Sequence, residues 1–295
     1  MRESPCHDFY KHLTELYYHF VVTEVVGSDG KTYKLEPRAS LVGAQLSGIN
    51  CPGVDLSFAD LSNADLSNSY FNNGKIKGDQ PRTMFKGANL QGANLQGANL
   101  GYVDLASVNL SGSDLRGAIL RSVKLSNTNF DGANMDHVDL TWAQFESANF
   151  SNVRMSYSDF TLAEFENVDF SNLDLSHSKF RNTKLNGANL SNTNCGYCDF
   201  TCSELKNTSL KGTDFSRSNF TQTDICGTDL SESNLSRVFL DDEFSIVKCD
   251  NATKWPNGIR TLRTEAELMQ YLSQNPRALR KLEKKNEKTF RSWMK

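Results

Sequence analysis

Residues 87–100 have the sequence GANLQGANLQGANL, in which GANL occurs in three copies at a spacing of five residues, and this five-residue unit decides the fold. The same spacing continues far beyond the three copies. From Phe85 to Leu240 every fifth residue is nonpolar, without one insertion or deletion, which makes 32 repeats. The residue two places before each central residue is usually small or β-branched, as at Ala88 and Val103. Two of every five positions are therefore reserved for an interior.

A nonpolar residue at every fifth position fits neither a straight helix nor a straight strand. On a helix with 100° per residue the series would scatter around the cylinder, and on a strand it would alternate between the two faces. The chain must therefore turn toward the same interior once in every repeat, at corners rich in Asn, Asp, Ser and Gly. This predicts an all-β solenoid whose stacked coils bond to one another and whose two end coils need caps.

The repeats resemble those of the pentapeptide repeat family, which follow the pattern A(D/N)LXX. The resemblance covers residues 41–240 and is specific because the array is so long. It implies a right-handed quadrilateral β-helix with four repeats in each coil, with the central and the small residue of every repeat pointing inward. Eight coils would then hold the 32 repeats, and at a strand spacing of about 4.8 Å they would form a rod about 38 Å long.

A shorter block of repeats precedes the long one. Its expected central residues are Leu41, Leu46, Cys51, Leu56, Leu61, Leu66, Phe71 and Ile76. Ile76 and Phe85 are nine positions apart, so the register must break at 77–84, where the sequence is KGDQPRTM. Gly78 and Pro81 favour a protruding loop or a kink. The break is either a structural irregularity or a loop that contacts a partner.

Both ends of the chain lie outside the repeats and are expected to cap the β-helix with short helices. At the N-terminus, residues 1–40, an amphipathic helix is predicted from Phe9 to Phe20 and a hairpin within 21–36 around Gly27–Gly30. At the C-terminus, residues 241–295, two basic amphipathic helices are predicted. Residues 250–295 carry 11 Lys and Arg against 5 Asp and Glu. Their charge fits a solvated helix face, a homodimer contact or an anionic partner.

No motif in the sequence predicts catalysis, a cofactor or a metal site. The chain has five histidines, three of them within the first twenty residues, and carboxylates recur at corners because corners favour Asp. Cys195 and Cys198 form a CxxC pair, but their places in the repeat are a central and a small position, so both are predicted to fill the core. We expect a protein that is not an enzyme.

If residues 20 apart are neighbours in successive coils, as the resemblance implies, the large outward side chains gather on two adjacent corners. Such residues supply much of the binding energy at protein interfaces, so these corners are the predicted partner-binding surface. The alternative is that the rings only stack to stabilise successive coils. The predicted partner-binding residues are Tyr102, His137, Trp142, Tyr157, Leu162, His177, Tyr197 and Arg217.

Two functions fit the sequence. The first is a non-catalytic protein-binding scaffold, either a bacterial regulator or an effector delivered into a host cell. The alternative, which follows from the resemblance, is a mimic of duplex DNA that binds a type II topoisomerase and protects gyrase. Residues 85–240 carry 17 acidic and 12 basic residues, without the continuous acidic stripes that a strong mimic needs, which favours the scaffold.

The expected location is the cytoplasm, with secretion into a host cell as the alternative. The N-terminal sequence lacks the features of a secretory signal, and no nonpolar stretch is long enough to span a membrane. The net charge of −3 gives no general preference for polyanions, so a nucleic-acid partner is not expected.

Overall fold

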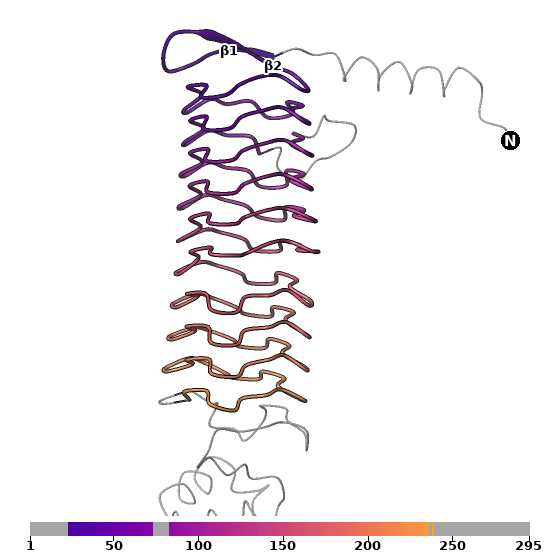
Figure 1. Ribbon diagram of the computed structural model, residues 1–295, viewed down its shortest axis with the longest axis vertical. Coiled ribbons are helices and arrows are strands. Elements are labelled where there is room, and N and C mark those ends of the chain that lie inside the picture. The colour runs from indigo at the N-terminus through magenta and orange to yellow at the C-terminus, as the bar shows by residue number, and fades with distance from the viewer. Residues whose placement is uncertain (1–22, 73–82, 236–237, 239–295) are drawn as a thin grey trace, which may run out of the picture. The chain divides into compact units, whose positions relative to one another are not determined.

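The computed structural model describes residues 23–72, 83–235 and 238, all of which belong to the compact unit Met1–Lys254. These residues form a stack of coils, one above the other along a single axis (Figure 1). Parallel bridges join residues 20 positions apart, for example Asn89 with Asn109 and Asn109 with Asn129. Each coil therefore contains four five-residue repeats, and the predicted right-handed quadrilateral β-helix is confirmed.

Backbone hydrogen bonds between coils recur once per repeat in each direction. The central Leu90 donates its N–H to the carbonyl of Asn109 at 2.7 Å, and Asn109 donates to the carbonyl of Ala88 at 3.0 Å. This ladder satisfies the peptide groups that face the neighbouring coils, which would otherwise be costly to bury. Every coil is thus held in place by the coil before it and the coil after it.

A tight turn closes each corner. Ala93 donates its N–H to the carbonyl of Leu90 at 3.0 Å, and Gly92, the third residue of this turn, has a φ of 65°. All described corners have a positive φ at this third residue, which is the requirement of a type II turn. Where Asp or Asn precedes the central residue, its side chain often supports the turn that follows, as where Asn109 Oδ1 accepts the N–H of Ser111 at 3.2 Å.

The interior is a column of central side chains. Leucines fill the N-terminal half, and phenylalanines dominate the C-terminal half, where rings of successive coils lie face to face. The centroids of Phe145 and Phe165 are 4.4 Å apart, and those of Phe180 and Phe200 are 4.9 Å apart. Hydroxyl groups at the small positions are buried but bonded, as where Thr183 Oγ1 donates to the carbonyl of Phe160 at 2.9 Å.

A hairpin precedes the first coil, as predicted. Its strands are β1 (Thr23–Val26) and β2 (Thr32–Leu35), which pair antiparallel. Ser28 in the connecting loop donates its N–H to the carbonyl of Gln45 at 2.8 Å, so the hairpin bonds to the first coil. The helices predicted within residues 1–40 and 241–295 lie outside the described residues. Within the described part of the chain, no helix has the length and nonpolar character needed to cross a membrane.

The predicted register break needs a correction. Asp55 pairs with Met84, so this bridge spans 29 residues instead of 20, and the coil accommodates nine additional residues between Asn72 and Thr83. Thr83 and Met84 were expected inside the break but belong to the array, and Phe85 takes the central position expected for Ile76. Ile76 itself lies outside the described residues.

The neck of this insertion is closed by one side chain. The hydroxyl of Thr83 donates to the carbonyl of Phe71 at 2.7 Å and accepts the N–H of Gly53 at 2.8 Å. The two ends of the insertion are therefore held together, and the bridges continue in register on either side of it.

Removing a core ring should destabilise the β-helix strongly. Phe165 is fully buried and contacts the rings of four other phenylalanines. We expect Phe165→Ala to lower the free energy of unfolding by about 3–5 kcal/mol, measured by urea titration with circular dichroism. The exposed neighbour Glu166 is the control, because Glu166→Ala should change it by no more than about 0.5 kcal/mol. A loss below about 1 kcal/mol for Phe165→Ala would contradict the proposed packing.

Candidate protein-binding surface

The third residue of each turn forms four vertical rows, one at each corner of the β-helix. Two rows consist largely of Gly, Asn and Ser. Gly and Asn tolerate the positive φ of the corner, and Ser has a small side chain. The other two contain the predicted binding residues. We call them the stacked corner, with His137, Tyr157, His177, Tyr197 and Arg217, and the tryptophan corner, with Tyr102, Ser122, Trp142, Leu162, Asn182, Cys202 and Gln222.

The rings of the stacked corner form a continuous column. Centroids of successive rings are 5.0 Å apart for His137 and Tyr157, 4.5 Å for Tyr157 and His177, and 4.6 Å for His177 and Tyr197. The guanidinium of Arg217 ends the column, 5.1 Å from the Tyr197 centroid. Stacking of this kind stabilises neighbouring coils, and it covers the ring faces so that mainly the ring edges meet solvent.

The tryptophan corner differs because its largest side chain is not stacked. Trp142 is 59% exposed and has a φ of 63°, and no ring within the described part of the chain contacts it. Its neighbours in the same row are Ser122 and Leu162. A left-handed conformation is unfavourable for residues other than glycine, and least so for Asn and Asp. Neither ring stacking nor the turn accounts for a tryptophan here.

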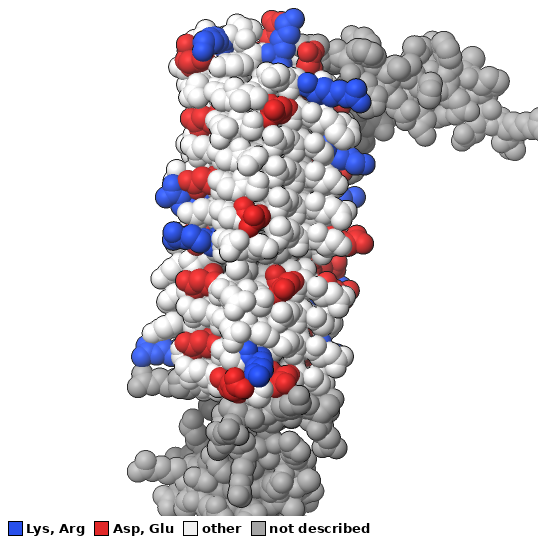
Figure 2. Space-filling model, in the orientation of Figure 1, with Lys and Arg blue, Asp and Glu red and all other residues white. Residues whose placement is uncertain are grey.

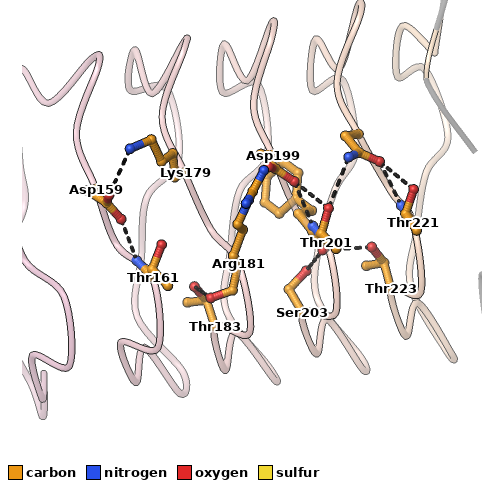
Figure 3. Close-up of polar contacts among 12 residues, drawn as sticks. Asp159, Thr161, Lys179, Arg181, Thr183, Asp199, Thr201, Ser203, Thr221 and Thr223 are labelled. Carbon is orange, nitrogen blue, oxygen red and sulfur yellow. Dashed lines mark hydrogen bonds and ion pairs between the residues drawn. The ribbon is translucent and has the colours of Figure 1, made fainter.

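A charged face separates these two corners. We call it the ladder face, and Figure 3 shows part of it. Its bridge residues include Asp139, Asp159, Lys179, Asp199 and Asn219. Lys179 Nζ lies 3.0 Å from Asp159 Oδ2, and Arg121 and Arg181 pair with Asp139 and Asp199. These charged side chains of the ladder face are therefore paired with each other.

Two carboxylates of the ladder face, Asp159 and Asp199, have a pKa below the ordinary value. Burial alone would raise the pKa of Asp199, but hydrogen bonds from Thr201 and Arg181 outweigh this effect, so its pKa lies below the ordinary value. Asp159 has a lowered pKa for the same reasons, with Thr161 and Lys179 as donors. These two carboxylates therefore stay charged at neutral pH, each beside its basic partner.

The cysteine pair belongs to the core, as predicted. Cys195 and Cys198 are both buried, and Cys198 Sγ donates to the carbonyl of Leu175 at 3.0 Å. Burial raises the pKa of the Cys195 thiol well above its ordinary value, so it stays protonated. Among the described residues, no group of three or more His, Cys, Asp and Glu side chains is placed to hold a metal ion.

The structure also exposes large side chains that the sequence analysis did not select. Phe58 is 59% exposed and occupies a corner position with a φ of 59°. Tyr70, which is 42% exposed, and Ile119 lie on the N-terminal half of the ladder face. Extending the rows upstream across the nine-residue insertion would have found Phe58 and Tyr70.

Two descriptions of pentapeptide repeats match the chain. "Pentapeptide repeat region" matches residues 103–180, and "Pentapeptide repeats (8 copies)" matches residues 39–78 and 198–237. Together the matches cover more than half of the chain. The chain belongs to the pentapeptide repeat family. No curated protein sequence matches it significantly.

Several solved pentapeptide repeat structures are similar to this chain. HetL, involved in heterocyst differentiation regulation in the cyanobacterium Nostoc sp. strain PCC 7120, is 22% identical, with a TM-score of 0.41 over 72% of this chain and 92% of HetL. A trypsin-treated variant of QnrB1, a plasmid-mediated fluoroquinolone resistance protein, is 20% identical, with a TM-score of 0.29 over 75% of this chain and 86% of QnrB1.

A pentapeptide repeat protein of the Arabidopsis thaliana thylakoid lumen is 28% identical, with a TM-score of 0.18 over 39% of this chain and 67% of that protein. At TM-scores of this size none of the three superpositions bears on function. Function has to be argued from the surface of this pentapeptide repeat protein itself.

The two corners should respond differently to the same substitution. His177→Asn removes two stacking contacts, so we expect it to lower the free energy of unfolding by about 1–2 kcal/mol. Trp142→Asn removes no ring contact and places a residue that tolerates positive φ, so the change should be below about 1 kcal/mol. Urea titration of both variants checks this. Equal losses would mean that Trp142 has a structural role comparable to that of His177.

Acid should weaken the ladder face. Because its pKa is lowered on folding, Asp199 stabilises the protein above its unfolded pKa, and this contribution is lost as the pH falls through the folded pKa. Asp199→Asn keeps an acceptor for Thr201, as Asn219 provides for Thr221, but loses the ion pair with Arg181. We expect the variant to lose up to about 1 kcal/mol at pH 7 and to approach the wild type below pH ~3.

Urea titrations across this pH range measure the effect. If the difference in free energy of unfolding between wild type and Asp199→Asn does not shrink as the pH falls, the ionised Asp199 does not stabilise the fold through its ion pair with Arg181.

Proposed function

We propose that this pentapeptide repeat protein is a non-catalytic scaffold that binds another protein through the tryptophan corner, the ladder face and the stacked corner. The observation that carries the proposal is Trp142, a large, half-exposed, unstacked ring in an unfavourable backbone conformation. Strained residues that the local structure does not explain cluster at functional sites, and tryptophan is enriched among the residues that dominate interface energies.

The surroundings of Trp142 support the same function. Leu162 lies next to it in the row, and Tyr157 and His177 border the other side of the ladder face. The paired charges between the two corners supply the polar contacts that surround nonpolar anchors in interfaces. The inter-coil hydrogen bonds hold the backbone that carries these side chains rigidly, so binding would require little backbone rearrangement.

A duplex-DNA mimic that binds a topoisomerase is less well supported by the charges. Lys179, Arg181 and Lys184 neutralise carboxylates on two faces of the β-helix, and one row alternates Asp104, Lys124, Gln144, Glu164, Lys184 and Glu204. On the face that Figure 2 shows, acidic and basic side chains are scattered among uncharged ones. A mimic of the phosphate backbone would benefit from a continuous acidic stripe.

The experiment is a quantitative capture from a lysate of the source organism by the immobilised full chain. Wild type, Trp142→Asn and Phe58→Asn are compared by mass spectrometry. Both variants replace an exposed aromatic residue by Asn at a corner with positive φ, so Phe58→Asn controls for the loss of an exposed ring outside the tryptophan corner. We expect at least one protein whose capture falls about tenfold or more with Trp142→Asn and is unchanged with Phe58→Asn.

Two outcomes would contradict the proposal. The same proteins captured equally by wild type and Trp142→Asn would remove the tryptophan corner from the binding surface. Recovery of topoisomerase subunits by both would favour the DNA mimic instead.

A further inference from the structure

We propose a second docking surface at a different corner, which binds an acidic segment of a partner protein around Phe58. This surface consists of Arg38, Phe58 and Lys86 and does not depend on the function proposed for the tryptophan corner. The segment it fits carries a nonpolar side chain between two carboxylates.

The three residues lie on consecutive coils. Arg38 and Phe58 are successive residues of one corner row, and Lys86 directly precedes Gly87, the next residue of that row. The backbone confirms this order, because Arg38 donates its N–H to the carbonyl of Ser57 and Phe58 donates to the carbonyl of Lys86, both at 3.0 Å. A cation therefore lies on each side of the phenylalanine along the axis of the β-helix.

The ring of Phe58 packs against Gly87, which leaves room for it because glycine has no side chain. A Cβ atom on Gly87 would lie 2.7 Å from two atoms of the Phe58 ring, so the ring rests against the backbone of Gly87. Even so, 59% of the residue is exposed. Like Trp142, Phe58 has a positive φ, which the turn would accommodate better with Gly or Asn.

The charges beside this ring are not compensated within the described part of the chain. Neither Arg38 nor Lys86 forms an ion pair there, whereas Lys31, Lys34 and Arg116 do. The carboxylate of Asp60, two residues after Phe58, is occupied by other donors, because its Oδ1 accepts the N–H of Ser62 and the Nδ2 of Asn89, both at 3.1 Å. An unpaired cation on either side of an exposed ring favours a ligand with negative charge on either side of a nonpolar group.

The spacing favours a polypeptide. Arg38 and Lys86 are two coils apart, about 9.6 Å at the usual strand spacing, and an extended chain covers this length in about three residues. Two carboxylates at positions i and i+3 with a nonpolar residue between them would match the surface. Recognition of an anionic membrane typically uses about four to eight basic residues, and this surface has two.

The test uses three labelled ten-residue peptides and the full chain. The probes are GSGEFGEGSG, the charge-reversed GSGKFGKGSG and GSGEGGEGSG, which lacks the phenylalanine. Affinity is measured by fluorescence anisotropy at low and at physiological ionic strength. We expect GSGEFGEGSG to bind about tenfold more tightly than either other peptide, and its affinity to fall as salt is added.

Matched variants locate the binding. Phe58→Asn should weaken binding of GSGEFGEGSG about tenfold, Arg38→Glu with Lys86→Glu should shift the preference to GSGKFGKGSG, and Trp142→Asn should change nothing. Circular dichroism verifies that each variant is folded. Equal binding of the acidic and the basic peptide, no binding of GSGEFGEGSG, or an equal loss with Trp142→Asn would each overturn the proposal. The first two outcomes have no bearing on capture of a partner through Trp142, which is a separate readout.

Discussion

The chain must return to the same corner after every twenty residues, and the turn at each corner requires a left-handed residue. The inter-coil hydrogen bonds, such as that from Leu90 to Asn109, form only when this return is accurate, and the nonpolar column forms only when they do. The corner turns, the inter-coil hydrogen bonds and the nonpolar core therefore form cooperatively. It tolerates nine additional residues between Asn72 and Thr83 because pairing continues in register from Met84 onward.

The same requirement makes the corners informative about function. Where a corner carries Gly or Asn, the backbone alone accounts for the residue. Where it carries a ring, something else must offset the backbone cost. At His177 and Tyr197 that compensation is visible as stacking, so these rings need no ligand to account for them. At Trp142 and Phe58 no ring contact provides it within the described residues, which separates residues that the sequence pattern alone cannot distinguish.

The sequence predicted the repeating architecture well because every repeat has the same pattern of a small residue, a central nonpolar residue and a turn. The inward positions, the CxxC pair in the core and the hairpin before the first coil all follow from such local patterns. The phase across the insertion did not, because counting from Ile76 ignores the long-range bridge between Asp55 and Met84 that sets it. Because of that error, the sequence analysis did not place Phe58 in the same corner row as Gly87. Whether an exposed ring is stacked depends on the orientation of its side chain, which cannot be determined from the amino-acid sequence alone.

A rigid ladder also constrains how two surfaces on it can act together. Phe58 and Trp142 lie about four coils apart, roughly 19 Å along the axis, on adjacent corners. Since each coil between them is bonded on both sides, ligation at one surface has no bistable element through which to change the other. Two separate partners would bind independently. One partner that contacts both surfaces would gain affinity through effective concentration, and only if its own spacing matched this fixed distance.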